Sequence, residues 1–587
     1  TIENVVVQVK GIQNDEKTQV RKKDKDQDKK KERSKETKKQ RPLTAYLFTG
    51  QSGLKKGVGM DLYEQYDFAK KIWDECDTYF LNELGISLLK IVRENPAEYV
   101  IDFNDGEKGA LLRQKYINLT LTQDEEVIQQ MSKQGISVRA FPEVGIDTPC
   151  YIYRSPHGLL RMTHFAQPII VVYEYVALQC LQLNRKKKSQ SKSSVVAEEE
   201  KDRLIFCGHS LGEYCALVAL GEIASAAEMA MICFVRGMVM QSCVERDPIT
   251  HISPYGMAAV SPSRVANWFK ADDLKQVISN VVDATSGRLL EIVNYNVFGD
   301  QYVVSGERYT IWLLGKVLSW VGEQGQLSMS QLSRFCFNLV ATTPHSSTPL
   351  DVPKTNAVLP LQGIDIPFHS RQLRSVVPLF RSFLEGRLPS ADTFSYAKQL
   401  DGRYITNVYS KELFTITVPF ARQLLQITNS PYLKELLGHY QNDDKSDEGN
   451  EKVGEEQGAL WDVLTPNERG RLLLRETLSY QFASAVQWID TQLTILQHGF
   501  RRIVEIGPTK TLASMFAKTL QRLPDQVQDG NEIHNELISE ASKIKQGGQI
   551  NGALSAVEIL SFETDREELE FIGNDNCDEH SDADEDD

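Results

Sequence analysis

The sequence predicts an α/β fold with a parallel-sheet core and a smaller inserted α+β unit. Residues 204–206 form an apolar, strand-like run that leads through the turn 208–212 directly into a helical pattern, as in a parallel sheet. Residues 44–48 form a similar strand, and the turn 49–53 again precedes helical periodicity. Between 255 and 364 short strands alternate with helical stretches, which is typical of an inserted α+β subdomain.

The composition is that of a soluble globular protein. A length of 587 residues predicts several structural units, and 41% hydrophobic with 25% charged residues excludes a membrane or disordered class. The net charge of −14 disfavours nucleic acid as a partner, because phosphate binding needs a concentrated basic surface. The longest apolar run, 168–183, carries Glu174 and Gln179 and is too short to cross a bilayer, so we expect no membrane partner.

The nine cysteines indicate a reducing compartment. They include no C-x-x-C pair and no Cys/His spacing typical of metal ligands, so we expect free thiols, a cytoplasmic location and no metal. No signal peptide is visible, and the chain begins with Thr1. We therefore expect an excerpt of a larger protein.

Charged segments flank the predicted core. Residues 1–20 hold one alternating strand without a nearby partner, which predicts the end of a preceding domain. Residues 21–42 are rich in Lys and Arg, and the C-terminal end of 524–587 is almost purely acidic. Because these charged stretches lack apolar residues to bury, we interpret them as linkers.

Ser210 is the first candidate for chemistry. It lies in the G-x-S-x-G element 208–212, where a strand turns sharply into a helix and forces the serine into strained backbone geometry. The start of the following helix points backbone N–H groups and a positive dipole end at negative charge beside Ser210. The element predicts acyl chemistry through a serine ester.

A serine nucleophile needs a base, and His369 is the best-placed histidine. It follows the apolar segment 364–368, whereas His209 points away from the reactive face of Ser210 and is expected to pack or hydrogen-bond. No aspartate stands at an obvious strand end between Ser210 and His369, which favours a dyad with a backbone carbonyl as the group that orients the ring.

Arg236 is the third candidate. It sits in the otherwise apolar helical run 232–241, where a guanidinium is costly to bury unless it meets an anion. A salt bridge to a protein acid and a bidentate contact with a substrate carboxylate are both open. We call the turn 208–212 around Ser210 the elbow. If Arg236 faces the elbow, the acyl group carries a free carboxylate.

Eight motifs follow one another along the chain. They are TGQSGLKKGVGMDLY, YRSPHGLLRMTHFAQP, GHSLGEY, RGMVMQ, VNYNVFGDQYVVSG, IPFHS, YQFASAVQWID and VEIGPTKTL. In this order they resemble the malonyl-CoA:acyl-carrier-protein transacylase family, and most of all the malonyl/palmitoyl transferase domain of fungal-type type I fatty acid synthases. The resemblance covers residues 43–523 and implies an α/β-hydrolase-like core with an inserted ferredoxin-like subdomain.

The resemblance assigns roles to the catalytic group. It implies Ser210 as nucleophile and His369 as general base, with Arg236 as ligand of the malonyl carboxylate. The backbone N–H groups of Gln51 and Leu211 would form the oxyanion hole.

Four further positions follow from the same resemblance. The backbone carbonyl of Gln487 would hold the His369 ring, and Phe368 matches the malonyl-selecting form of its motif. Gln167 and Asn296 match polar positions that line the cleft. One departure stands out, because the family pattern Gly-Gln-Gly-Ser reads Gly-Gln-Ser52-Gly here.

The resemblance also implies organisation and partners. Residues 1–20 would end a hot-dog dehydratase region and 21–42 would be a linker. Residues 43–254 and 365–523 would form the large acyltransferase subdomain, 255–364 the inserted subdomain, and 524–587 an extension toward the carrier protein. The implied partners are acyl carrier protein, malonyl-CoA, long-chain acyl-CoA and the other synthase domains, in a hexameric assembly.

The resemblance implies no bound cofactor, since coenzyme A thioesters and the phosphopantetheine of the carrier protein act as substrates. Two other functions share the elbow. A serine thioesterase or hydrolase predicts an acid at a strand end and has no need of Arg236. An inactive structural module of the synthase is the third alternative, to which Ser52 gives slight support, although we expect activity to be retained.

Overall fold

A five-stranded parallel sheet forms the centre of the compact unit 43–587. The computed structural model describes residues 43–51, 53–188, 204–221, 223–247, 252–326, 328–345, 352–438, 460–522, 557–566 and 569. The predictions for 1–42, Ser52 and the acidic end lie outside these residues. The sheet order is β11-β10-β1-β4-β9, with every pair parallel. Its strands are β1 (Thr44–Phe48), β4 (Leu204–Gly208), β9 (Tyr404–Ile405), β10 (Arg502–Ile506) and β11 (Glu558–Ser561).

Side chains of β1 alternate between two hydrophobic cores. Tyr46 and Phe48 pack into one core, while Ala45 and Leu47 pack into the other. Both faces are covered, as expected of a parallel sheet, so apolar side chains of β1 point to both faces instead of alternating with polar ones. The predicted α/β fold with a parallel-sheet core is confirmed.

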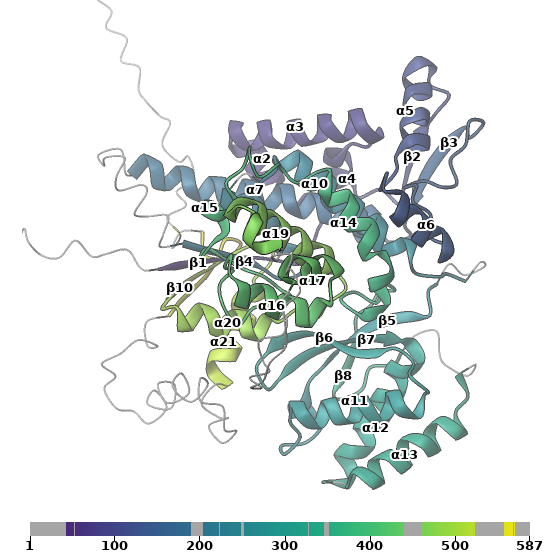
Figure 1. Ribbon diagram of the computed structural model, residues 1–587. Helices are drawn as coiled ribbons and strands as arrows, with labels where there is room; N and C mark the ends of the chain where they lie inside the picture. The colour runs from purple at the N-terminus through teal and green to yellow at the C-terminus, as the bar shows by residue number, and fades with distance from the viewer. Residues whose placement is uncertain are drawn as a thin grey trace, which may run out of the picture. The chain divides into compact units, whose positions relative to one another are not determined.

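The first core is built with helices from the N-terminal and middle parts of the chain (Figure 1). They are α2 (Met60–Gln65), α3 (Asp67–Leu84), α4 (Leu88–Glu94), α7 (Thr163–Lys188), α9 (Gly212–Gly221), α10 (Ala226–Ser242), α14 (Val377–Glu385), α15 (Tyr396–Leu400), α16 (Val418–Thr428), α17 (Pro431–Leu437), α18 (Leu460–Val463) and α19 (Pro466–Gln481). An antiparallel pair of strands, β2 (Glu98–Asp102) and β3 (Cys150–Arg154), also belongs to this part. The segment between these two strands contains α5 (Gly106–Asn118) and α6 (Glu125–Lys133).

The second core includes α20 (Trp488–Gln497) and α21 (Leu512–Arg522) and continues into a four-stranded antiparallel sheet. This sheet has the order β6-β7-β5-β8, from β5 (Tyr255–Val260), β6 (Leu290–Val297), β7 (Gln301–Glu307) and β8 (Val358–Pro360). Helices α11 (Ala271–Ala284), α12 (Arg308–Gln324) and α13 (Met329–Thr342) pack with it (Figure 1). Apart from the extra helix α13, the βαββαβ order is that of a ferredoxin-like unit.

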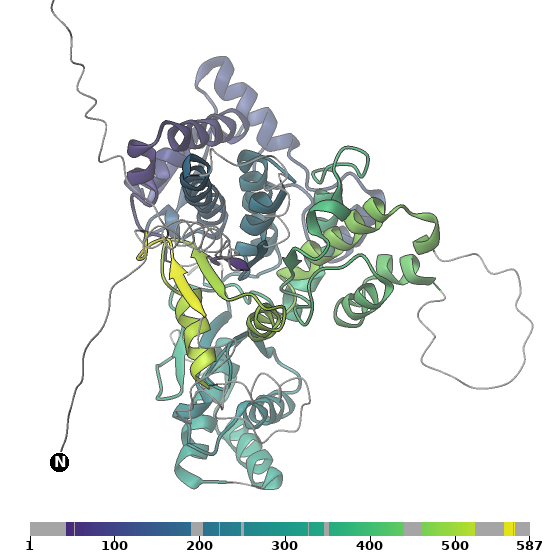
Figure 2. The ribbon, with the colours of Figure 1, turned by 90° about the vertical axis from the view of Figure 1, so that its left-hand side faces the viewer.

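The strand β11 extends the sheet beyond the part of the chain that the motifs cover. It lies in 524–587, which the sequence assigned to an extension and linker, yet it pairs in parallel with β10 at the sheet edge. Figure 2 shows β11 in yellow beside β10. The run VEILSF at 557–562 is an apolar, strand-like signal, but the division of the chain at 524 assigned it to the extension.

Candidate active site

Ser210 occupies the turn between β4 and α9, as its motif predicts. Its φ is 55°, in the left-handed region that non-glycine residues seldom adopt. The glycines on either side are required by space. A side-chain carbon on Gly208 would lie 1.9 Å from the carbonyl carbon of Gly212, and one on Gly212 would lie 2.0 Å from the Phe48 oxygen.

His369 meets Ser210 across 159 positions of sequence. Its Nε2 lies 2.7 Å from Ser210 Oγ, and its own φ of 63° also falls in the left-handed region. Burial, helped by the nearby positive charge of Arg236, lowers the pKa of His369 to about 3. The ring is therefore neutral near pH 7 and free to accept the Ser210 proton at Nε2.

Two backbone carbonyls orient this ring. His369 Nδ1 lies 3.0 Å from the Gln481 oxygen and 3.1 Å from the Ser484 oxygen, which fixes the proton on Nδ1. His369 Nδ1 thus faces carbonyls, whereas a serine hydrolase would be expected to place a strand-end acid there. The expected kind of orienting group is present, but at different residues.

The structure corrects the expectation for Gln487. This residue is the N-cap of α20, and its carbonyl accepts a bond from the Thr491 N–H at 3.0 Å. The chain between the end of α19 and the start of α20 turns Gln481 and Ser484 toward the ring instead. The motif YQFASAVQWID located this segment, but no signal within it indicates which carbonyl faces the histidine.

Arg236 lies on α10 and is 2% exposed. Its two terminal nitrogens donate to amide oxygens, Nη1 to Gln167 at 2.9 Å and Nη2 to Gln481 at 2.8 Å. The guanidinium also lies 5.2 Å from the ring centre of Tyr214. Among the described residues no carboxylate forms an ion pair with Arg236, and its Nε has no hydrogen-bond partner. The structure thus removes the salt-bridge alternative for that part of the chain and leaves a buried cation suited to a carboxylate.

Gln481 connects the two parts of the site. Its side-chain oxygen accepts from Arg236, its amide nitrogen donates to the Ser210 carbonyl, and its backbone carbonyl holds His369. Sequence reasoning missed this residue. The only available signal was an amide side chain at the end of a helix in a quoted motif.

The turn after β1 packs against the elbow. A side-chain carbon on Gly50 would lie 2.9 Å from the His209 carbonyl oxygen, so the two turns approach closely. Gln51 Oε1 accepts from Gln167 at 3.2 Å, and its amide donates to Thr163 at 3.2 Å. Leu211, directly after Ser210, is fully buried. The oxyanion roles of the Gln51 and Leu211 N–H groups stay predictions.

A buried glutamate fixes the start of that turn. Glu174 of α7 is 0% exposed and accepts from the Thr49 N–H at 3.0 Å and from the Thr49 hydroxyl. Burial raises its pKa well above the usual carboxyl value. Thr163, Gln167 and Glu174 follow one another at helical spacings of four and seven, so one stripe of α7 contacts the turn.

The remaining predicted residues border the elbow. Asn296 of β6 is 2.9 Å from His209 Nε2, which supports a hydrogen-bonding role for His209. The His209 ring also meets Trp488 edge to face at 5.5 Å. Phe368, half-buried, precedes His369 and packs against the hydrophobic cores.

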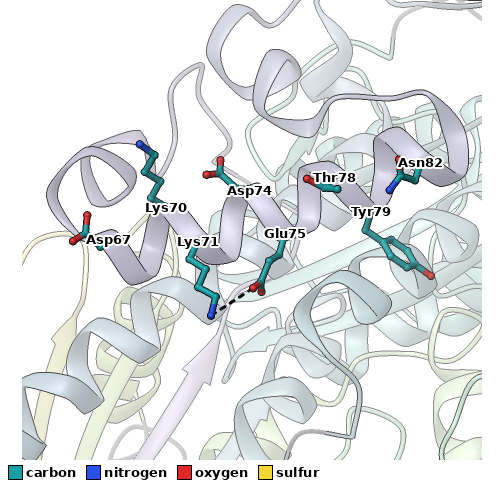
Figure 3. Close-up of a pocket in the computed structure, with 8 residues that line it drawn as sticks. All are labelled: Asp67, Lys70, Lys71, Asp74, Glu75, Thr78, Tyr79 and Asn82. Atoms are coloured by element: carbon teal, nitrogen blue, oxygen red, sulfur yellow. Dashed lines mark ion pairs between the residues drawn. The ribbon is translucent and has the colours of Figure 1, made fainter.

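A surface pocket lies outside this group of residues. Figure 3 shows its lining along α3. The lining residues are Asp67, Lys70, Lys71, Asp74, Glu75, Thr78, Tyr79 and Asn82, none of them a predicted site residue. In the described part of the chain no group of His, Cys, Asp and Glu is suited to hold a metal, and no described helix is long and apolar enough to cross a membrane.

Comparison with known proteins gives a family match over residues 45–414, described as an acyl transferase domain. A fatty acid synthase 2 of Mycosarcoma maydis is 34% identical over 493 residues, which are 82% of this chain and 12% of that protein. The fatty acid synthase subunit beta of Saccharomyces cerevisiae is 32% identical over 418 residues, 69% of this chain and 19% of that protein. The chain thus spans 12% to 19% of these relatives.

Solved structures give a more distant likeness. A malonyl CoA-acyl carrier protein transacylase from Coxiella burnetii matches with a TM-score of 0.44 and 15% identity, covering 86% of this chain and 99% of that chain. An acyl-carrier-protein-S-malonyltransferase from Bartonella henselae matches with a TM-score of 0.45 and 18% identity, covering 90% of this chain and 97% of that one.

Proposed function

The chain belongs to the acyl transferase domain family, and from this premise we propose that it transfers malonyl groups between coenzyme A and an acyl carrier protein. The transfer passes through an ester on Ser210 and serves fatty acid synthesis. The relatives are synthases, and the names of two distant structural neighbours specify malonyl transfer to a carrier protein. No bound cofactor is needed, since both thiols are substrates.

One observation carries the choice of substrate. Arg236 is a buried cation whose terminal nitrogens bond to the neutral amides of Gln167 and Gln481. The Tyr214 ring lies beside the guanidinium. A buried charge is costly without a counter-charge, and a guanidinium binds a carboxylate with two parallel hydrogen bonds. The malonyl carboxylate supplies this partner, whereas an uncharged acyl group does not.

The first half-reaction loads Ser210. His369 Nε2 takes the hydroxyl proton as Oγ attacks the thioester carbonyl carbon of malonyl-CoA. The N–H groups of Gln51 and Leu211 stabilise the tetrahedral oxyanion. The carbon–sulfur bond then breaks, and coenzyme A leaves as a thiol with the proton held by His369.

The second half-reaction unloads the serine. The phosphopantetheine thiol of the carrier protein gives its proton to His369 and attacks the ester carbonyl. The carbon–oxygen bond to Ser210 breaks, and His369 returns the proton to Oγ. The carbonyls of Gln481 and Ser484 keep the ring in one tautomer through both halves.

Palmitoyl transfer to coenzyme A is the proposed second activity, carried over from the resemblance. A long apolar chain cannot pair with Arg236, so the guanidinium swings aside when such a chain binds. Phe368 favours malonyl over methylmalonyl, and Asn296 lines the same cleft.

We also propose the wider setting. The large subdomain consists of residues 43–254 and 365–523, and residues 255–364 form the inserted subdomain. The separate four-stranded sheet within 255–360 supports this division. Residues 1–20 end a dehydratase region, 21–42 form a linker, and 524–587 lead toward the carrier protein. The whole synthase is a cytoplasmic, hexameric assembly.

Incubation with radiolabelled malonyl-CoA tests the function. We expect a stable label on the wild-type chain, no label on Ser210→Ala, and transfer of the label to added carrier protein. Rapid release of label to water would instead indicate a hydrolase. A folded wild-type chain that takes no label would indicate an inactive module.

A further inference from the structure

We propose that Asn407 is a positioning residue that holds Ser210 in its reactive geometry by clamping the backbone on both sides of the elbow. Asn407 follows β9 and is 2% exposed. Its Oδ1 accepts from the Ser210 N–H at 2.6 Å, and its Nδ2 donates to the Gly208 carbonyl at 2.5 Å. One amide side chain therefore bonds to backbone groups on both sides of His209.

The elbow needs such a clamp because of its backbone conformation. A non-glycine residue at a φ of 55° is strained, and such a conformation persists only when its surroundings hold it. A buried N–H or C=O left without a hydrogen-bond partner also destabilises the folded state. Asparagine offers an acceptor and a donor in one plane, whereas a carboxylate offers acceptors only.

Asn407 is itself held through its main chain. Its N–H donates to Glu213 Oε1 at 3.3 Å, and its carbonyl accepts from the Gln487 N–H at 3.1 Å. The pairing of Phe206 with Tyr404 and of Cys207 with Ile405 fixes the height of Asn407 along β4. Tyr404 donates its hydroxyl to the same Glu213 oxygen. The clamp thus has a fixed base on α9, β9 and α20.

The inference rests on the proposed role of Ser210 as nucleophile and adds a residue that touches no substrate. Its consequence is kinetic. Misplacing a nucleophile by about 1 Å costs on the order of 100-fold in rate. Loss of the clamp should therefore slow ester formation while leaving the binding of malonyl-CoA, which depends on Arg236, unchanged.

The first test compares Asn407→Leu with Asn280→Leu in the full chain. Asn280 is an 8% exposed asparagine of α11 whose amide donates to the Gln276 carbonyl, so it matches the burial without contacting the elbow. Rapid-quench measurement of Ser210 labelling should give about a 100-fold lower rate for Asn407→Leu at an unchanged half-saturating malonyl-CoA concentration. Asn280→Leu should keep the wild-type rate. Equal rates for all three folded proteins would overturn the proposal.

The second test uses Asn407→Asp and remains informative if Asn407→Leu fails to fold. The introduced carboxyl can donate to Gly208 and accept from Ser210 only while protonated. The rate relative to wild type should therefore be nearly normal at low pH and fall as the carboxyl ionises. Glu213, Tyr404 and His369 face this region, and dividing by the wild-type rate at each pH removes their own titration. A ratio that does not change with pH would overturn the proposal, whereas a wild-type chain without label would instead overturn the proposed function.

Discussion

The two halves of the site are built from different kinds of structure. Ser210 and His369 both lie in turns, and both have left-handed backbone conformations with φ values of 55° and 63°. Arg236 and Gln167 lie within the helices α10 and α7, in regular backbone and fully enclosed by side chains. The turn half holds the reacting atoms in strained backbone, whereas the helical half presents a buried charge. Under the proposed function, reactivity and acyl selection belong to different halves, and Gln481 contacts both of them.

The largest effect should come from the turn half. His369→Ala removes the base and should lower both malonyl and palmitoyl transfer, each by about 10²–10⁴-fold, because every acyl group uses the same proton transfer. Steady-state transfer assays with the two thioesters measure this. His164→Gln is a matched control, since His164 is also buried but contacts Gln241 rather than Ser210. A loss confined to malonyl would contradict the separation.

The helical half should give a smaller and selective effect. Arg236→Ala should lower malonyl transfer by about 100-fold and leave palmitoyl transfer nearly unchanged, because only the carboxylated group pairs with the guanidinium. Parallel kcat/KM measurements for both thioesters provide the test. Arg236→Lys serves as the control that keeps charge without the planar two-point contact. An equal decrease in kcat/KM for both thioesters would contradict the proposed role of Arg236.

Gln481 should give an intermediate pattern because it contacts both halves. Gln481→Ala removes the Arg236 and Ser210 side-chain bonds but keeps the carbonyl that orients His369. We expect about a tenfold loss for malonyl, from one or two buried hydrogen bonds, and a smaller loss for palmitoyl. Gln481→Glu should act mainly on malonyl, since the new carboxylate would occupy Arg236. A palmitoyl loss larger than the malonyl loss would show that the link serves only the turn half.

The smallest effect concerns pH. Burial and Arg236 lower the pKa of His369 to about 3, so the inactive protonated form should appear only well below the usual histidine pKa of 6.5. Ester formation should therefore change little between about pH 8 and pH 5.5. In Arg236→Ala, assayed with palmitoyl-CoA, the acid limb should move to higher pH because a nearby positive charge is gone.

Glu213 is the control for this profile, since burial raises its pKa to about 7. Glu213→Gln keeps an acceptor for Tyr404 and Asn407 and should retain the flat region. If the wild type loses activity near pH 6.5 and Glu213→Gln does not, the titration belongs to Glu213. The same loss in both would place the pKa of His369 near its ordinary value.

Local pattern alone predicted the parts of the site that a few adjacent residues define. The G-x-S-x-G element predicted the turn at Ser210, and the glycines at 208 and 212 are indeed required by contacts of 1.9 and 2.0 Å. A lone arginine in an apolar run pointed to a buried cation, which Arg236 is. The apolar segment before His369 made it the best-placed histidine, the resemblance gave it the role of general base, and its Nε2 lies 2.7 Å from Ser210 Oγ.

Contacts between distant segments were not predictable in this way. The carbonyls that hold His369 belong to Gln481 and Ser484 rather than Gln487, and the strand β11 joins the edge of the sheet from the segment expected to be an extension. Asn407 reaches Ser210 across 197 positions of sequence. All backbone carbonyls are chemically alike, and so are all asparagine side chains. The sequence therefore does not indicate which of them bonds to a given partner.

The parallel α/β core, the turn at Ser210 and the buried cation followed from the sequence, because each depends on residues within a few positions of one another. Only the folded chain shows which carbonyls face His369, which amides bond to Arg236 and which side chain bonds to the Ser210 N–H. These contacts depend on how α19, β9 and α7 pack around β4. Hydrogen bonds form only over a narrow range of distances. The packing of these elements therefore decides which groups come close enough to bond.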